Sequence, residues 1–167
     1  EAGCIELSTI DGLADSHELG EDDLEWLYGE LERRRLWDGE RLRGAYIVNA
    51  VKCLPPGNRP TTDEQQRCRP WLERELTALD RARVVLALGR IAHGAVLRAW
   101  GVRPLARHPF AHARVDALPG RPALVASYHP SRQNTNTGVL TRPMWRAVFE
   151  RAFQLAKPRR TPTRSAA

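Results

Sequence analysis

The sequence has few cysteines and no long apolar run, and each shortage excludes a class of protein. Three cysteines, Cys4, Cys53 and Cys68, are too few for a disulfide framework. No stretch of about 18 consecutive apolar residues is present, so a membrane span is not expected. No basic-then-apolar segment opens the chain, so nothing indicates secretion. We therefore expect a cytoplasmic protein with reduced cysteines, in which the open question is whether they bind a metal or a cluster.

Charge is divided unevenly along the chain. Residues 1–40 hold 13 acidic residues against three arginines, a balance of −10, whereas the remainder carries a balance of +16. A basic body is typical of proteins that contact phosphates, and basic surfaces also aid solubility, so charge alone leaves both interpretations open.

The length and the composition predict one domain with flanking segments. A chain of 167 residues that is 42% hydrophobic can bury one core and is too short to expect two. We expect an acidic N-terminal segment over residues 1–40 with one helix, a folded domain over 41–155 and a basic disordered tail over 156–167. The helix follows from the spacing of Leu24, Leu27, Tyr28 and Leu31.

Short apolar runs alternate with helical patterns through the domain. Runs at 45–51, 83–88 and 123–128 predict buried strands, the second of them turning at Gly89 into a helix over 91–100. Thr61 and Glu64 form a capping box that predicts a helix start, and Pro70 is expected to break that helix or begin a second piece. A last helix is predicted over 141–155, and residues 104–122 are expected to be irregular.

This alternation predicts an α/β domain, a three-layer α/β/α sandwich with a short, mostly parallel central sheet. Ligands of such sheets bind at the carboxyl ends of strands. We expect Asn49 and His129 to lie at the carboxyl ends of two neighbouring strands and to face one shared cleft. Four polar residues of the irregular segment could contact phosphate, although the favoured interpretation is that they lie in a solvated loop. They are Arg107, His108, His112 and Arg114.

Four segments occur in the order and spacing of a known enzyme family. They are residues 46–58 (YIVNAVKCLPPGN), 68–72 (CRPWL), 86–89 (LALG) and 129–138 (HPSRQNTNTG). Together they resemble the iron–sulfur uracil-DNA glycosylases of family 5, type B, over roughly residues 42–153. The sequence does not contain that family's Cys-x-x-Cys or its Gly-Leu-Ala-Pro-Ala-like first motif, so an N-terminally incomplete member is expected.

The resemblance implies catalytic roles for His129 and Asn49. Cleaving the N-glycosidic bond of deoxyuridine leaves negative charge on uracil, which a donor at O2 stabilises, and His129 matches the family histidine in this role. A carboxamide can accept from uracil N3–H and donate to O4, and Asn49 matches the residue that reads the base. A structural histidine and an amide paired with a neighbouring loop are the alternatives.

The resemblance also implies a DNA-binding segment and a cluster. Ser131 matches a residue near the DNA phosphate, and the neighbouring residues match the segment inserted into the gap left by the extruded base: Arg132, Gln133, Asn134, Thr135, Asn136 and Thr137. Cys53 and Cys68 match two of the four thiolates that hold a [4Fe–4S] cluster. Two buried structural cysteines without a cluster are the alternative.

The sequence therefore predicts a monofunctional glycosylase of base-excision repair that hydrolyses the bond to uracil, or to a related deaminated base, in DNA. A covalent Schiff-base route is not expected, because Lys52 and Lys157 are the two lysines of the chain and neither occupies a motif position from which to form a Schiff base with the sugar. We expect a monomer, associated with the nucleoid, whose partner is DNA containing the damaged base. A truncated homologue without turnover and a non-enzymatic DNA-binding module are the rival hypotheses.

Overall fold

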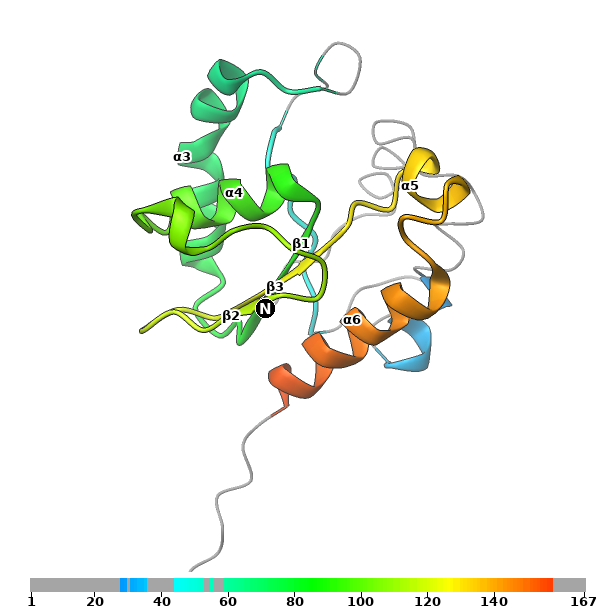
Figure 1. The fold of residues 1–167 in the computed structure, drawn as a ribbon. Helices are drawn as coiled ribbons and strands as arrows, with labels where there is room; N and C mark the ends of the chain where they lie inside the picture. The colour runs from blue at the N-terminus through cyan, green and yellow to red at the C-terminus, as the bar shows by residue number, and fades with distance from the viewer. Residues whose placement is uncertain (1–27, 30, 36–43, 53–54, 56–58, 158–167) are drawn as a thin grey trace, which may run out of the picture.

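The computed structural model describes residues 28–29, 31–35, 44–52, 55 and 59–157 (Figure 1). Its elements in chain order are α3 (Thr62–Ala78), β1 (Val84–Leu88), α4 (Arg90–Ala99), the 3-10 turn η2 (Leu105–Arg107), β2 (Val115–Asp116), β3 (Ala123–Ser127), α5 (Arg132–Asn136) and α6 (Arg142–Ala156). Most of the expected N-terminal segment, and the tail from residue 158 onward, lie outside the described residues.

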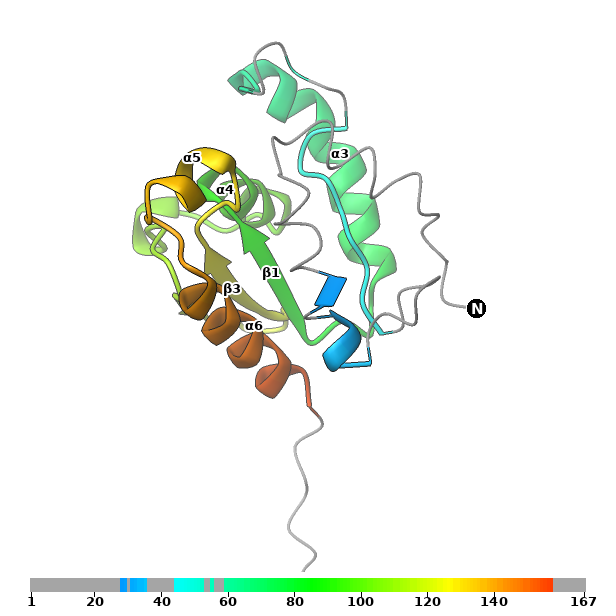
Figure 2. The ribbon, with the colours of Figure 1, turned by 90° about the vertical axis from the view of Figure 1, so that its right-hand side faces the viewer.

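The sheet has three described strands in the order β1-β3-β2. β1 and β3 run parallel, from the pair Val84 and Ala123 to the pair Leu88 and Ser127, and β2 joins β3 antiparallel. Figure 2 shows α6 on one side of β1 and β3 and α3 on the other, and α4 packs against both strands. The α/β sandwich with a mostly parallel sheet is confirmed, as are the strands predicted in the second and third apolar runs.

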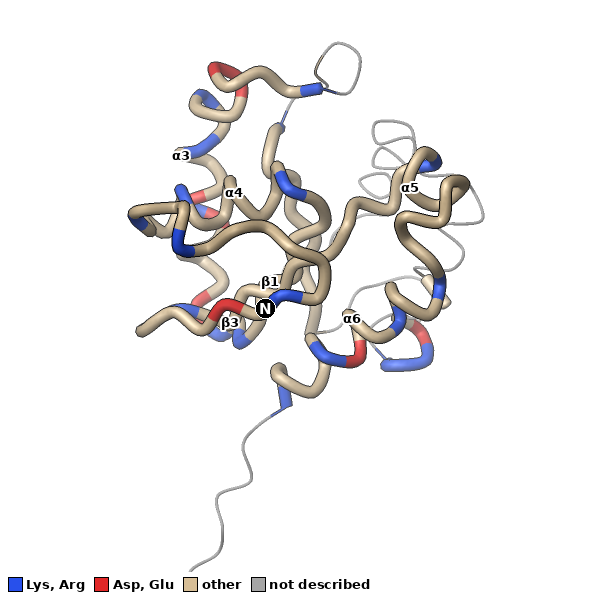
Figure 3. Tube along the Cα trace, viewed as in Figure 1, with Lys and Arg blue, Asp and Glu red and all other residues tan. Residues whose placement is uncertain are grey.

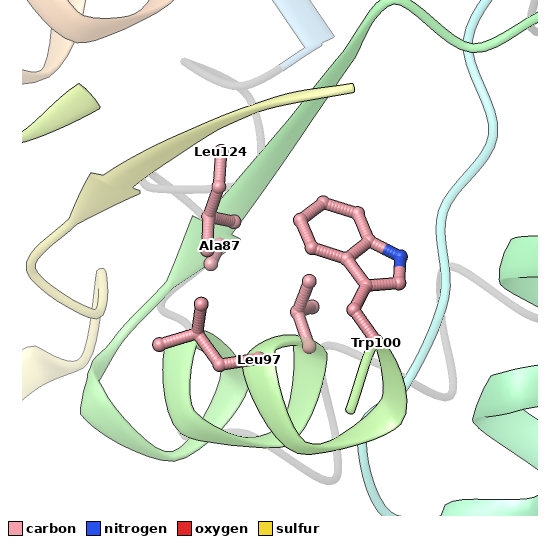
Figure 4. Packing of buried hydrophobic residues seen from close by; sticks show 5 residues of the cluster. Ala87, Leu97, Trp100 and Leu124 are labelled. Carbon is pink, nitrogen blue, oxygen red and sulfur yellow. The ribbon is translucent and has the colours of Figure 1, made fainter. Parts of the chain in front are cut away.

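One face of the sheet carries the core beneath α4. Ala87 and Leu124 on the strands pack against Val96, Leu97 and Trp100 (Figure 4). Because side chains alternate along a strand, the residues beside Leu124 point to the opposite face, where α6 covers them. The two helices therefore fix the sheet from both faces, and with it the place where each strand ends.

α3 begins where the capping box predicts and ends later than expected. The Thr61 side chain accepts from the Glu64 backbone, and the Glu64 carboxylate accepts from the Thr61 N–H. The prediction that Pro70 breaks the helix is wrong, since α3 is continuous through it. A proline removes one backbone hydrogen bond, whereas Cys68 and Leu72 on one face of α3 are both buried and stabilise the helix on either side of it.

Two other local predictions are wrong. Residues 45–49 carry no strand assignment, and their neighbour Lys52 instead bonds to Cys68 and Glu75 of α3. An apolar run becomes a strand only where a partner strand supplies its hydrogen bonds, and periodicity does not report the partner. The segment expected to be irregular contains η2 and β2, which is a short strand bonded to β3.

The described part of the N-terminal segment packs against the last helix. Residues 28–29 and 31–33 are helical, and Leu31 is buried. Arg34 lies 3.3 Å from a Glu150 carboxylate oxygen and 6.0 Å from the Phe153 ring centroid, both on α6. None of the described helices is long and apolar enough to span a lipid bilayer.

Candidate functional site

The carboxyl ends of β1 and β3 meet at Gly89 and His129. The Gly89 N–H donates to the Ser127 carbonyl at 2.8 Å, which ties the turn after β1 to the end of β3. Gly89 has φ of +95°, and a Cβ added there would stand 3.1 Å from the His129 Cβ. Only glycine allows both this backbone conformation and this close approach, so the turn that starts α4 is shaped around His129.

The backbone at His129 is held on both sides. The Tyr128 N–H donates to Nδ1 of His112 at 3.1 Å, and the His129 carbonyl accepts from the Asn134 amide at 2.8 Å. Pro130, which follows, is fully buried. His129 itself is half-buried. The histidine predicted to be catalytic therefore projects from a fixed stretch of chain at the end of a strand.

The predicted DNA-binding residues form a single helical turn, α5, beyond this point (Figure 1). Ser131 caps the turn by accepting from the Asn134 N–H at 3.4 Å. Three of the seven residues are half-buried, namely Ser131, Asn134 and Thr135, and the other four are exposed: Arg132, Gln133, Asn136 and Thr137. The exposed members are free to meet a ligand, whereas the Asn134 amide is already bonded to the chain.

A buried carboxylate anchors the loop that carries His112. Asp116 is 5% exposed and accepts from Arg114 Nη2 at 2.8 Å and from Arg114 Nε at 3.0 Å. His108 Nδ1 lies 2.9 Å from the same carboxylate. The favoured interpretation of this segment as a solvated loop is thus wrong for these residues, because their polar groups turn inward to one carboxylate.

The surroundings of Asp116 shift two pKa values. Burial raises the pKa of the Asp116 carboxyl, but the hydrogen bonds from Arg114 and His108 outweigh it and lower the pKa to about 2. Burial lowers the pKa of His93, more than the nearby Asp116 raises it. His93 Nε2 lies 3.5 Å from Asp116 Oδ2, longer than a well-formed hydrogen bond, so the carboxylate offsets only part of the effect of burial on the pKa of His93.

Asn49, the predicted reader of the base, lies in the segment 44–52 and is half-buried. Its position at a strand end is not found, because the segment is not a strand. A hollow of about 270 Å³ opens beside its neighbour Ala50, and the lining residues are mostly polar: Thr62, Gln65, Gln66, Arg69, Leu72, Ala95 and Arg98. Neither Asn49 nor His129 lines it, so their convergence on one cleft stays a prediction.

The predicted cluster ligands are described in part. Cys68 is 7% exposed, and its sulfur accepts from the Lys52 N–H at 3.3 Å. Cys53 lies outside the described residues, yet its neighbour Lys52 touches Cys68. No group of three or more His, Cys, Asp or Glu residues suited to a metal occurs among the described residues. The described part of the chain supplies one thiolate and does not by itself fit a four-thiolate cluster.

Comparison with known proteins identifies the family of this fold and site. The family model of the uracil DNA glycosylase superfamily matches residues 17–154. The chain belongs to the uracil DNA glycosylase superfamily. In this chain His129 follows the end of β3, and Gly89 leaves space for it.

The curated relatives support placement in family 5. The chain is 50% identical over 119 residues to the Type-5 uracil-DNA glycosylase of Thermus thermophilus, covering 71% of this chain and 54% of the relative. It is 46% identical over 115 residues to that of Pyrobaculum aerophilum, covering 69% and 49%. A Type-4 enzyme of Archaeoglobus fulgidus is 32% identical over 119 residues, covering 70% and 56%. The chain spans about half the length of these relatives.

Sequence reasoning missed three residues that shape the site. The sequence predicts a turn at Gly89, but only the structure shows that His129 occupies the space that a side chain at position 89 would need. The sequence favours a solvated loop for His112, but in the structure the His112 ring stacks on the Tyr128 ring with centroids 4.9 Å apart. Asp116 carries no signal in the sequence, and only the structure shows that it is buried in β2, where a carboxylate requires partners.

Proposed function

We propose that this protein removes uracil from DNA by hydrolysing the N-glycosidic bond, as the first step of base-excision repair. The observation that supports this most directly is the fixed placement of His129 at the carboxyl end of β3, against Gly89. The relatives in Thermus thermophilus and Pyrobaculum aerophilum are named uracil-DNA glycosylases, which supports the same reaction.

In the proposed mechanism, His129 stabilises the departing base. Electron density moves into the uracil ring as the bond to the sugar breaks, and a donor at O2 stabilises the anion that forms. Such a donor increases the rate of the chemical step by a factor of about 10²–10³ where the site excludes water. Asn49 reads N3–H and O4 of the base and so favours uracil over cytosine, which presents the opposite donor and acceptor pattern.

DNA is the proposed partner, and the exposed face of α5 is the proposed contact. Arg132 and Gln133 follow the Ser131 cap directly, so phosphate or base contacts there lie next to His129. Extruding a base costs a few kcal/mol, which contacts at α5 would offset. We further propose that the chain acts as a monomer, at the nucleoid in the cytoplasm.

A [4Fe–4S] cluster is proposed for the complete site, with Cys53 and Cys68 as two of its ligands. When bound, such a cluster would join the segment before Cys53 to α3. No step of the proposed reaction uses it. The Lys52 contact to Cys68 supports the proximity of the two cysteines with or without the metal.

The experiment that tests the function is uracil release from defined oligonucleotides. Single-stranded DNA, a U:G pair and a U:A pair are compared with the same sequences carrying thymine, and binding is measured in parallel. Release of uracil and retention of thymine support the glycosylase. Binding without release favours the rival hypothesis of a DNA-binding homologue without turnover.

A further inference from the structure

His112 lies directly beside the backbone that carries His129. Its Nδ1 accepts the Tyr128 N–H at 3.1 Å, and its ring stacks on the Tyr128 ring at 4.9 Å with 25° between the planes. Since a backbone N–H only donates, Nδ1 must be unprotonated and the ring proton must sit on Nε2. The contact is therefore available only to neutral His112.

We propose that His112 is a positioning residue for His129: in its neutral form it holds the Tyr128 N–H, and on protonation it releases this end of β3. A protonated ring would place an N–H against the Tyr128 N–H, so the acceptor becomes a repelling donor. The bond is one residue from His129, whose own carbonyl is held by Asn134 on the other side. Losing one of the two contacts leaves the histidine less well oriented.

The groups around His112 favour the neutral form. Tyr128 faces the ring from the end of β3, and the backbone at Met144 meets it from α6. Burial lowers the pKa of His112, and the hydrogen bond at the Met144 backbone raises it by less. The effect of burial is the larger of the two, so the balance favours the neutral ring.

The rest of the loop keeps His112 in place. Phe110 lies 6.0 Å from the Tyr128 ring and 5.7 Å from the His93 ring, with Arg90 over its face at 5.3 Å. Asp116 binds residues on both sides of His112, namely His108 before it and Arg114 after it. A loop fastened on both sides of His112 is what a positioning contact needs, since a mobile loop would not hold the Tyr128 N–H.

Two substitutions separate the acceptor from the shape of the ring. His112→Asn places an amide oxygen where Nδ1 stands, because both atoms are bonded to Cγ, and this oxygen does not titrate. His112→Phe keeps the stacking on Tyr128 and removes the acceptor. His108→Asn serves as a control for general loosening of the loop, because His108 contacts Asp116 and not Tyr128.

The measurement is amide exchange and histidine ring shifts by NMR on the folded chain, from about pH 5 to pH 8. In the wild type, the protection of the Tyr128 amide should fall about tenfold as His112 is protonated, the size expected for one hydrogen bond. Protection should be independent of pH in His112→Asn and low at every pH in His112→Phe. The NMR signals of the His129 ring should change over the same pH range as the protection of the Tyr128 amide.

Three results would overturn the proposal: protection of the Tyr128 amide that stays constant in the wild type while the His112 ring signals titrate, unchanged protection in His112→Phe, or an equal loss in His108→Asn. The pH range is extended downward until the His112 ring signals titrate, because burial lowers the pKa of this ring. If the phenylalanine variant does not fold, the proposal is still tested by comparing the pH dependence of Tyr128 amide protection in the wild type and in His112→Asn. The benefit to catalysis rests on the proposed function, but the exchange experiment does not need turnover. Failure of uracil release with the exchange result intact would refute the function and leave the contact standing.

Discussion

At the scale of single residues, the position of His129 depends on the residues around it. Gly89 provides space, His112 and Asn134 hold the backbone, and Asp116 anchors the loop. None of these contacts can be read from the order of residues along the chain. The motif over residues 129–138 identifies the histidine and contains Asn134, whereas Gly89 and His112 lie 40 and 17 residues before His129 and come near it only in the folded structure.

Gly89→Ala should disturb His129 as well as the backbone. The new Cβ would stand 3.1 Å from the His129 Cβ, at a φ of +95° that side chains rarely adopt. We expect a loss of about 2–3 kcal/mol in the free energy of unfolding, measured with urea, and a shift of the His129 ring signals. Gly120→Ala is the matched control, since its φ is +68° and nothing lies within 4 Å of the added Cβ. Equal effects in both variants would rule out the contact with His129.

Asp116→Asn should remove a pH-dependent part of the stability. The pKa of Asp116 is lowered to about 2 in the folded protein, below its usual value, so its contribution is present at neutral pH. It should be lost as the pH falls from about 4 towards 2, with a size of about 2 kcal/mol. Urea unfolding of the wild type and the variant at several pH values would show it. A difference between them that stays constant down to low pH would contradict this account.

At the scale of elements, the strands β1 and β3 and the helix α6 could be predicted because each has a strong local pattern. The capping box of α3 and the Thr141 cap of α6 are local signals of the same kind. Whether residues 45–51 form a strand could not be predicted from a local pattern, because a strand needs a partner strand from another part of the chain. The two-residue strand β2 is too short for any periodicity to reveal.

Pro70 tests the continuity of α3. An alanine at this position restores the backbone donor and removes the clash of the ring with the preceding turn. Because α3 runs through Pro70 without interruption, Pro70→Ala should raise the free energy of unfolding by about 1–3 kcal/mol. Thermal and urea unfolding would measure it. No gain, or a loss, would indicate that the helix is broken at Pro70, as the sequence alone suggests.

At the scale of the whole molecule, positive charge is spread over the described elements. Figure 3 shows Lys and Arg on α3, α5 and α6, and it shows acidic residues on α3 as well, which partly balance the positive charge there. Residues 41–167 carry a balance of +16. Such a surface attracts the phosphate backbone without reading sequence, and leaves specificity to the groups near His129.

Affinity for DNA should therefore fall steeply with salt. Each neutralised phosphate contributes about −0.9 to the slope of log K against log salt concentration on duplex DNA. We expect a slope of about −3 or steeper, with little dependence on sequence, by fluorescence anisotropy on random and uracil-containing duplexes. Association that ignores salt, or is absent at low salt, would count against both the glycosylase and the binding module.

The most direct test of the account compares uracil release by the wild type and His129→Ala on one uracil-containing oligonucleotide. The account predicts release by the wild type and a rate about 10²–10³ lower in the variant, with DNA affinity and fold retained in both. A folded, DNA-bound wild type that releases no uracil would contradict the proposed function. A variant as fast as the wild type would contradict the role given to His129.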